Sequence, residues 1–66
     1  MVIERIELNV NGIIKWHLIV DGVGRGYFDL LSNCNERIEH FKKTKCRKGE
    51  KVTIKEINLE EEQFNE

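Results

Sequence analysis

Three side chains of the types that bind zinc or act as nucleophiles lie in the second half of the chain: Cys34, His40 and Cys46, with His17 far from them. Structural zinc sites use close pairs of ligands, such as two cysteines separated by two to four residues. Cys34 and His40 are six positions apart, about 240° around a helix, so they cannot converge on one ion. A Cys–His nucleophile pair fails for the same reason and lacks a third group to orient it. We therefore expect a buried Cys34, a surface His40, no metal site and no cofactor.

Carboxylates are the next candidates for chemistry, since acid–base catalysis needs them in pairs. Glu36 and Glu39 lie three positions apart, and Asp21 and Asp29 lie closer to the N-terminus. Neighbouring cations such as Arg37 explain the two glutamates as a solvated helix face. The sequence therefore predicts no catalytic residue, and we expect the protein not to be an enzyme.

The segment "DGVGRG", residues 21 to 26, suggests a loop that could bind phosphate. Glycines allow backbone N–H groups to close on an oxyanion, and Arg25 would add positive charge. The spacing is G-x-G-x-G, however, and not the G-x-G-x-x-G of dinucleotide-binding units, for which 66 residues are also too few. We predict a flexible turn over these residues.

Positive charge is concentrated in residues 42 to 51, the basic segment, which holds six of the eleven cations and one acid. Its cations are Lys42, Lys43, Lys45, Arg47, Lys48 and Lys51. A nucleic-acid-binding protein would use them for phosphates. Against this, the net charge is −1, the isoelectric point is about 6.1, and no aromatic residue lies within the segment for stacking on bases. A solvated helix end and a contact with an acidic protein surface remain open alternatives.

The end of the chain, "LEEEQFNE", is acidic. It could meet the basic segment of another copy, or imitate phosphates and block a nucleic-acid site on another protein. A solvated terminus is the simpler interpretation. We treat residues 1–59 as a single domain and residues 60–66 as a tail that could fray.

The size of the chain limits what it can do. A domain of about 60 residues buries only about 60% of its unfolded surface, so its core is thin and self-association is expected. Deep pockets need more chain. No apolar run approaches the roughly 20 residues that span a bilayer, and the N-terminus does not have the pattern of a signal peptide. We expect a cytoplasmic protein with free thiols and no membrane partner, and its composition suggests a phage or mobile-element source.

The elements begin with a hairpin. Residues 5 to 10 alternate between polar and apolar types, as a half-buried strand does, and Asn11-Gly12 before "IIKWHLIV" is a strong hairpin signal. A two-residue loop would pair Leu8 with Lys15 and mix the two faces. We prefer a three-residue loop over residues 10–12, which places Gly12 in the left-handed position. The buried face would then comprise Ile6, Leu8, Ile14, Trp16 and Leu18.

A short strand at about 27–31 and a helix at about 34–45 are predicted next. Asn33 followed by Glu36 has the spacing of a capping box, although Asp29 is an alternative cap. Apolar residues at helical spacing, Cys34, Ile38 and Phe41, would cover Trp16, Leu18 and Ile54. Lysines near the end of the helix oppose its dipole.

The last strand, "KVTIKEINL", changes parity. Val52 and Ile54 point one way, whereas Ile57 and Leu59 point the other. We expect either a bulge near residues 55–56 or a strand that is covered on both faces. Asn58 could begin one more helical turn.

Together these elements predict an α+β fold of order β-β-β-α-β, with a small antiparallel-rich sheet and one helix packed on one face. The expected function is protein binding, as an accessory factor or inhibitor, and the protein could be a homodimer. The alternative is a nucleic-acid-binding regulator that uses the basic segment. The predicted partner-binding residues are Arg25, Tyr27, Lys43, Lys45, Arg47 and Lys48.

Overall fold

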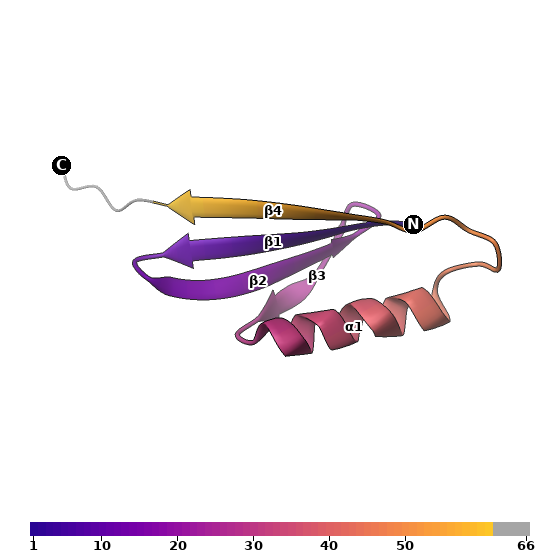
Figure 1. The fold of residues 1–66 in the computed structure, drawn as a ribbon, viewed down its shortest axis with the longest axis horizontal. Helices are drawn as coiled ribbons and strands as arrows, with labels where there is room; N and C mark the ends of the chain where they lie inside the picture. The colour runs from indigo at the N-terminus through magenta and orange to yellow at the C-terminus, as the bar shows by residue number, and fades with distance from the viewer. Residues whose placement is uncertain (62–66) are drawn as a thin grey trace.

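Four strands and one helix follow one another in the computed structural model, which describes residues 1–61. They are β1 (Val2–Val10), β2 (Ile13–Val20), β3 (Val23–Phe28), α1 (Leu31–Thr44) and β4 (Thr53–Glu61). The strands form one sheet in the order β3-β2-β1-β4, and α1 lies along one side of it (Figure 1). The predicted α+β fold with a β-β-β-α-β order is confirmed. Since β4 runs parallel to β1 and the other pairs are antiparallel, the sheet is mixed.

The β1–β2 hairpin has a two-residue turn, so the predicted three-residue loop is wrong. Val10 pairs with Ile13 across Asn11 and Gly12, whose φ angles are 56° and 83°. Two positive φ angles give the turn a twist that matches the right-handed twist of the strands. The turn geometry thus decides the register. As a result, Leu8 lies opposite Lys15.

The glycine-rich segment forms a strand and not the predicted flexible turn over residues 21–26. Only Asp21 and Gly22, with φ angles of 51° and 82°, make the β2–β3 turn. β3 then pairs with β2 from Val23 to Phe28, with one irregularity opposite residues 17–19. The predicted strand at 27–31 therefore starts four residues earlier and ends at Phe28, because β2 offers backbone partners to Val23 and Gly24 as well.

α1 begins at Leu31 and ends at Thr44, close to the predicted 34–45. The predicted capping box is wrong, because Asn33 and Glu36 lie inside the helix and the N-cap residue, Leu30, has no side-chain cap. The last turn carries Lys42 and Lys43, as expected. Among the described residues, no helix combines the length and the apolar character needed to cross a bilayer.

The core lies between α1 and one face of the sheet. Its buried side chains are Ile3, Leu18 and Val20 from the sheet and Cys34, Ile38 and Phe41 from the helix, and Trp16 packs at their border. The predicted helical cover over Trp16 and Leu18 is confirmed. The prediction that the helix also covers Ile54 is wrong, because the Ile54 side chain is 43% exposed. α1 packs against β2 and β3, so it does not extend over β4 at the edge of the sheet.

β4 pairs with β1 in unbroken register, from Thr53 beside Val2 to Glu61 beside Val10. The predicted bulge is therefore wrong, and so is a helical turn beginning at Asn58, which lies within the strand. The predicted acidic tail at 60–66 starts in β4, and its residues 62–66 lie outside the described part of the chain.

Candidate functional site

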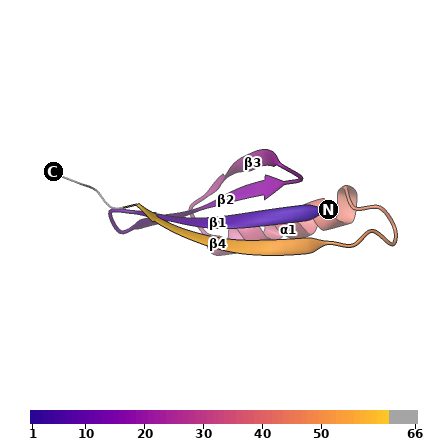
Figure 2. The same ribbon diagram turned by 90° about the horizontal axis from the view of Figure 1, so that it is seen from above.

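The sheet has one face toward α1 and one open face, which no element within residues 1–61 covers (Figures 1 and 2). Paired residues on neighbouring strands share a face, and successive residues alternate. Ile3 and Leu18 are buried under α1, so Arg5 and Glu7 also lie on the helix side. The even-numbered residues of β1 therefore project from the open face.

Six apolar residues gather on this open face and form what we term the apolar stripe: Ile6, Leu8, Val10, Ile13, Ile57 and Leu59. The pairing brings them together, because Ile6 lies beside Ile57 and Leu8 beside Leu59. Val10 lies opposite Ile13 at the hairpin. The stripe therefore crosses three strands and runs toward the end of the hairpin.

The predicted buried face of the hairpin is thus only half right. Trp16 and Leu18 face the helix, whereas Ile6 and Leu8 face away from it. The helix side of β1 instead carries Arg5, whose guanidinium donates to Asn35 of α1 and lies 2.6 Å from the Glu56 carboxylate. From Arg5 onward, β1 therefore carries polar residues on its helix side and apolar residues on its open side, which reverses the usual pattern for this one strand.

A shallow apolar groove of about 330 Å³ lies within the open face. Its walls come from the hairpin and from Tyr27 of β3, and its lining residues are Leu8, Val10, Asn11, Ile13, Lys15 and Tyr27. Tyr27 is 63% exposed and stacks on His17 of β2, with 4.2 Å between the ring centroids. A ring nitrogen of His17, Nδ1, lies 3.1 Å from the Gly26 carbonyl oxygen. The histidine thus holds an exposed aromatic ring beside the apolar stripe.

Charged residues of both signs border the apolar stripe. Lys15 lies beside Leu8 in the register and forms an ion pair of 3.0 Å with Asp29. Glu4 and Lys55 are register partners on the open face, next to the row that contains Ile6. An apolar centre with a polar rim is the usual arrangement of a protein–protein contact surface.

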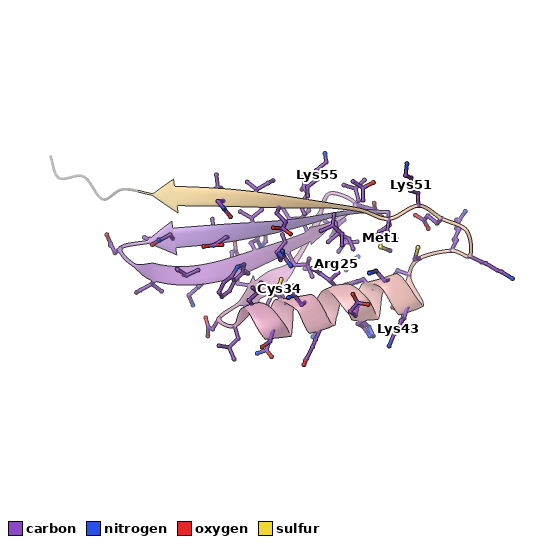
Figure 3. All side chains as sticks on the ribbon, in the orientation of Figure 1. Met1, Arg25, Cys34, Lys43, Lys51 and Lys55 are labelled. Atoms are coloured by element: carbon purple, nitrogen blue, oxygen red, sulfur yellow. The ribbon has the colours of Figure 1, made fainter. Side chains whose placement is uncertain are left out.

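The predicted partner-binding residues do not form one site. Tyr27 projects from the open face, whereas the Arg25 guanidinium lies 5.3 Å from the centroid of the Phe41 ring, between the sheet and the helix (Figure 3). The four predicted cations are exposed, but they lie at the C-terminal end of α1 and in the loop that follows; they are Lys43, Lys45, Arg47 and Lys48. That end of the molecule is opposite the hairpin (Figure 1).

The loop that carries these cations is fixed by the amino group of Met1. This ammonium lies 2.6 Å from the Glu50 carboxylate and 2.9 Å from the carbonyl oxygen of Lys51, to both of which it donates. The Arg47 backbone N–H also donates to Glu50, at 2.9 Å. The bond from the ammonium, and then the bond from Arg47, lower the pKa of Glu50. The bond to Glu50 raises the pKa of the Met1 amino group.

Two of the residues considered for metal or nucleophilic chemistry, Cys34 and His40, differ in burial as predicted. Cys34 is buried and His40 is exposed. Burial raises the pKa of the Cys34 thiol, and the positive charge of Arg5 opposes this shift. Within residues 1–61, no three side chains of His, Cys, Asp or Glu come together as metal ligands would.

A second hollow, of about 540 Å³, lies on the helix side and is widely open to solvent. Phe28 of β3 and four polar residues of α1 line it: Asn33, Glu36, Arg37 and His40. Of these, none forms a hydrogen bond or ion pair with another in the described chain.

Comparison with known proteins adds no functional information: no family model, curated protein or solved structure matches the chain. The class that the fold defines is a small α+β domain. Its distinctive feature is the apolar stripe on the open face.

Sequence reasoning missed this stripe, although two signals for it were present. The two-residue loop at Asn11-Gly12 implies the observed register directly. The parity change between Ile54 and Ile57 shows that β4 has apolar side chains on both faces. The first signal conflicts with the single buried face that was predicted for the hairpin.

Proposed function

We propose that the chain is a non-enzymatic protein-binding domain, an accessory factor or inhibitor, and that the apolar stripe is its contact surface. The observation that carries this proposal is the position of Ile6, Leu8, Ile57 and Leu59 side by side on a face that no described element covers. Contiguous apolar patches of more than a few hundred Å² are rare on soluble monomers and mark interaction sites.

Tyr27 supports this proposal. Tyrosine is among the residues that supply the most binding energy at protein interfaces, because it combines a large apolar ring with a hydroxyl group. Here the ring is held by His17, so less conformational freedom is lost on binding. Lys15 and Lys55 at the border of the stripe would steer the approach of a partner and contribute less to affinity.

Two substitutions of the same residue type on the same strand test this proposal. Ile57→Lys places a charge in the apolar stripe, whereas Ile54→Lys places the same charge on the helix side of β4. We expect a protein captured by the wild-type chain, once identified, to bind Ile57→Lys at least about tenfold more weakly, as for a central interface residue. Its affinity for Ile54→Lys should remain within about twofold. Calorimetry on each folded variant gives these values, and equal affinities contradict the proposal.

A nucleic-acid-binding regulator is the second candidate, and the basic segment supports it. Four cations of the basic segment are exposed at one end of the molecule: Lys43, Lys45, Arg47 and Lys48. Glu50 is the one acidic residue of this segment. Figure 3 shows Lys43 and Lys51 pointing outward at this end. Phosphate contacts would make binding fall steeply with salt.

A gel shift with generic DNA and RNA at low and moderate salt tests this second candidate. Salt-sensitive retention that is lost in Lys45→Glu and kept in Ile57→Lys would support nucleic-acid binding through the basic segment. No retention at micromolar protein would contradict it. The two candidates therefore respond to different substitutions, Ile57→Lys on the open face and Lys45→Glu in the basic segment.

A further inference from the structure

We propose that the protein which covers the open face is a second copy of this chain, packed sheet against sheet in a symmetric dimer. This inference rests on the proposed function, because it names the occupant of the same surface. Four observations favour a second copy: the size of the core, the charges around the apolar stripe, the two sheet edges and the area of the open face.

The core of one copy is small. Only six side chains of the described residues are buried, and all lie between α1 and the sheet. A domain of this size gains little net stability from one such layer. The open face of a second copy, packed on this one, would bury Ile6, Leu8 and Ile57 in a second apolar layer. The two sheets would then form a sandwich with about 10 Å between them.

The charges on the open face favour self-association. Glu4 and Lys55 lie side by side on the open face, and Lys15 already has Asp29 as its counter-charge. The open face therefore carries a few charged residues of each sign, and they do not form a cluster of one sign. Such a surface can meet its own copy without like-charge repulsion, and it offers little to select a strongly charged partner.

The sheet edges are less suitable than the face for joining two copies. β4 carries the adjacent charges of Lys55 and Glu56 at its middle, and charged residues protect edge strands from pairing. β3 is short, and its pairing with β2 is irregular between His17 and Ile19. Edge-to-edge pairing is thus disfavoured at both sides, whereas the centre of the apolar stripe, at Ile6, Leu8 and Ile57, carries no charge.

The area of the open face is sufficient for a weak dimer. The four strands have nine, eight, six and nine residues, and at about 3.3 Å per residue and about 4.8 Å per strand they give about 500 Å² of flat area for each copy. Standard interfaces bury about 800 Å² for each partner. Side chains that project from the sheet add to the flat area. We therefore expect a dimer with a dissociation constant in the micromolar range.

The interface would be isologous, so the same stripe supplies both surfaces. Each substitution in the stripe then acts twice in the dimer. Ile57→Lys should raise the dissociation constant at least about a hundredfold, which corresponds to about tenfold for each copy of the substitution. Ile54→Lys, on the other face of the same strand, should change it by less than about threefold.

Sedimentation equilibrium of the full chain, over about 1 to 500 µM, tests the proposal. The wild type should move from monomer to dimer, and Ile57→Lys should stay monomeric. Leu59→Lys is a second variant, since Leu59 is 48% exposed and its substitution is tolerated by the fold more easily. Circular dichroism confirms that each variant is folded.

Each outcome of this experiment decides the question. A folded wild type that stays monomeric at every concentration overturns the second-copy proposal, and so does a dimer that both stripe variants leave intact. A monomeric wild type whose other protein partner is lost in Ile57→Lys leaves the proposed function standing. A third outcome is that Ile57→Lys abolishes the dimer but binds another protein partner as tightly as the wild type does. This outcome supports the dimer and shows that the other partner does not bind to the apolar stripe.

Discussion

On β4, Ile54 and Ile57 project from opposite faces of the sheet, although only three positions separate them. Ile54 pairs with Ile3, which is buried beneath α1, whereas Ile57 pairs with Ile6 on the open face. An odd separation changes the face in a strand whose register is unbroken, as the register of β4 is. β4 thus places Ile54 on the helix side, where it stays 43% exposed, and contributes Ile57 and Leu59 to the apolar stripe.

The hairpin turn offers a direct test of the observed register. Gly12 has a φ of 83°, a conformation that costs other residues about 1–2 kcal/mol. We expect Gly12→Ala to lower the free energy of unfolding by about 1 kcal/mol in urea denaturation. Gly24→Ala is a matched control, since its new Cβ would lie 3.5 Å from the His17 ring, in ordinary contact. An equal loss in both variants would contradict this account of the turn.

The hairpin also shows how far the sequence could predict the fold. The sequence predicts a turn at Asn11-Gly12, a helix that buries Cys34 and Phe41, and the element order. It does not predict the register, because apolar residues occur on both faces of β1, namely Ile3 and Ile6. Local turn geometry resolved this conflict, and the assumption of one buried face gave the wrong answer.

β3 shows a second limit of prediction from sequence. Three glycines in "DGVGRGYF" have little strand propensity, and on local grounds they favour a turn. The strand forms because β2 provides a neighbouring backbone, from Val20 opposite Val23 to Trp16 opposite Phe28. That tertiary effect is not encoded in the segment itself. The register irregularity of this pairing, between His17 and Ile19 of β2, breaks the alternation of β3 and lets Arg25 and Tyr27 project from opposite faces.

The core predicts a strong response to substitution at one position. Leu18 is fully buried between Cys34, Ile38 and Phe41 of the helix and its neighbours in the sheet. Leu18→Ala should lower the free energy of unfolding by about 3 kcal/mol, from lost burial and the cavity that remains. Val23→Ala, at a half-exposed position of β3, should cost less than about 1 kcal/mol. Urea midpoints of both variants give the comparison, and similar values would show that α1 does not pack as described.

The two cysteines should differ in reactivity. Cys34 is fully buried and burial raises the pKa of its thiol, so little thiolate is present at neutral pH. Cys46 is partly exposed in the loop after α1. We expect iodoacetamide at neutral pH to label Cys46 first, as followed by mass spectrometry, and Cys34 to react only when urea unfolds the chain. Cys46→Ser should abolish the fast phase. A fast phase that survives this substitution would show that the helix opens readily.

The contact between Met1 and Glu50 predicts a stability maximum near neutral pH. The pKa of Glu50 is lowered in the folded chain, so its contribution is complete above its unfolded pKa of about 4.3 and is lost as the pH falls through the folded value. The pKa of the Met1 amino group is raised. Its contribution is therefore complete below about pH 8 and is lost as the pH rises through the folded value. Both are present together between about pH 5 and pH 8.

Glu50→Gln tests this account because it removes the charge at one side of the contact. Urea midpoints measured from pH 3 to pH 10 should show a flatter pH dependence for this variant than for the wild type, at both limbs of the profile. Glu36→Gln, on the exposed side of α1, is the matched control and should retain the wild-type curve. Amide exchange at Arg47, whose N–H donates to Glu50, should become faster in Glu50→Gln alone. Identical pH profiles for all three forms would mean that the ammonium–carboxylate contact does not hold the loop, and that its cations move independently of the sheet.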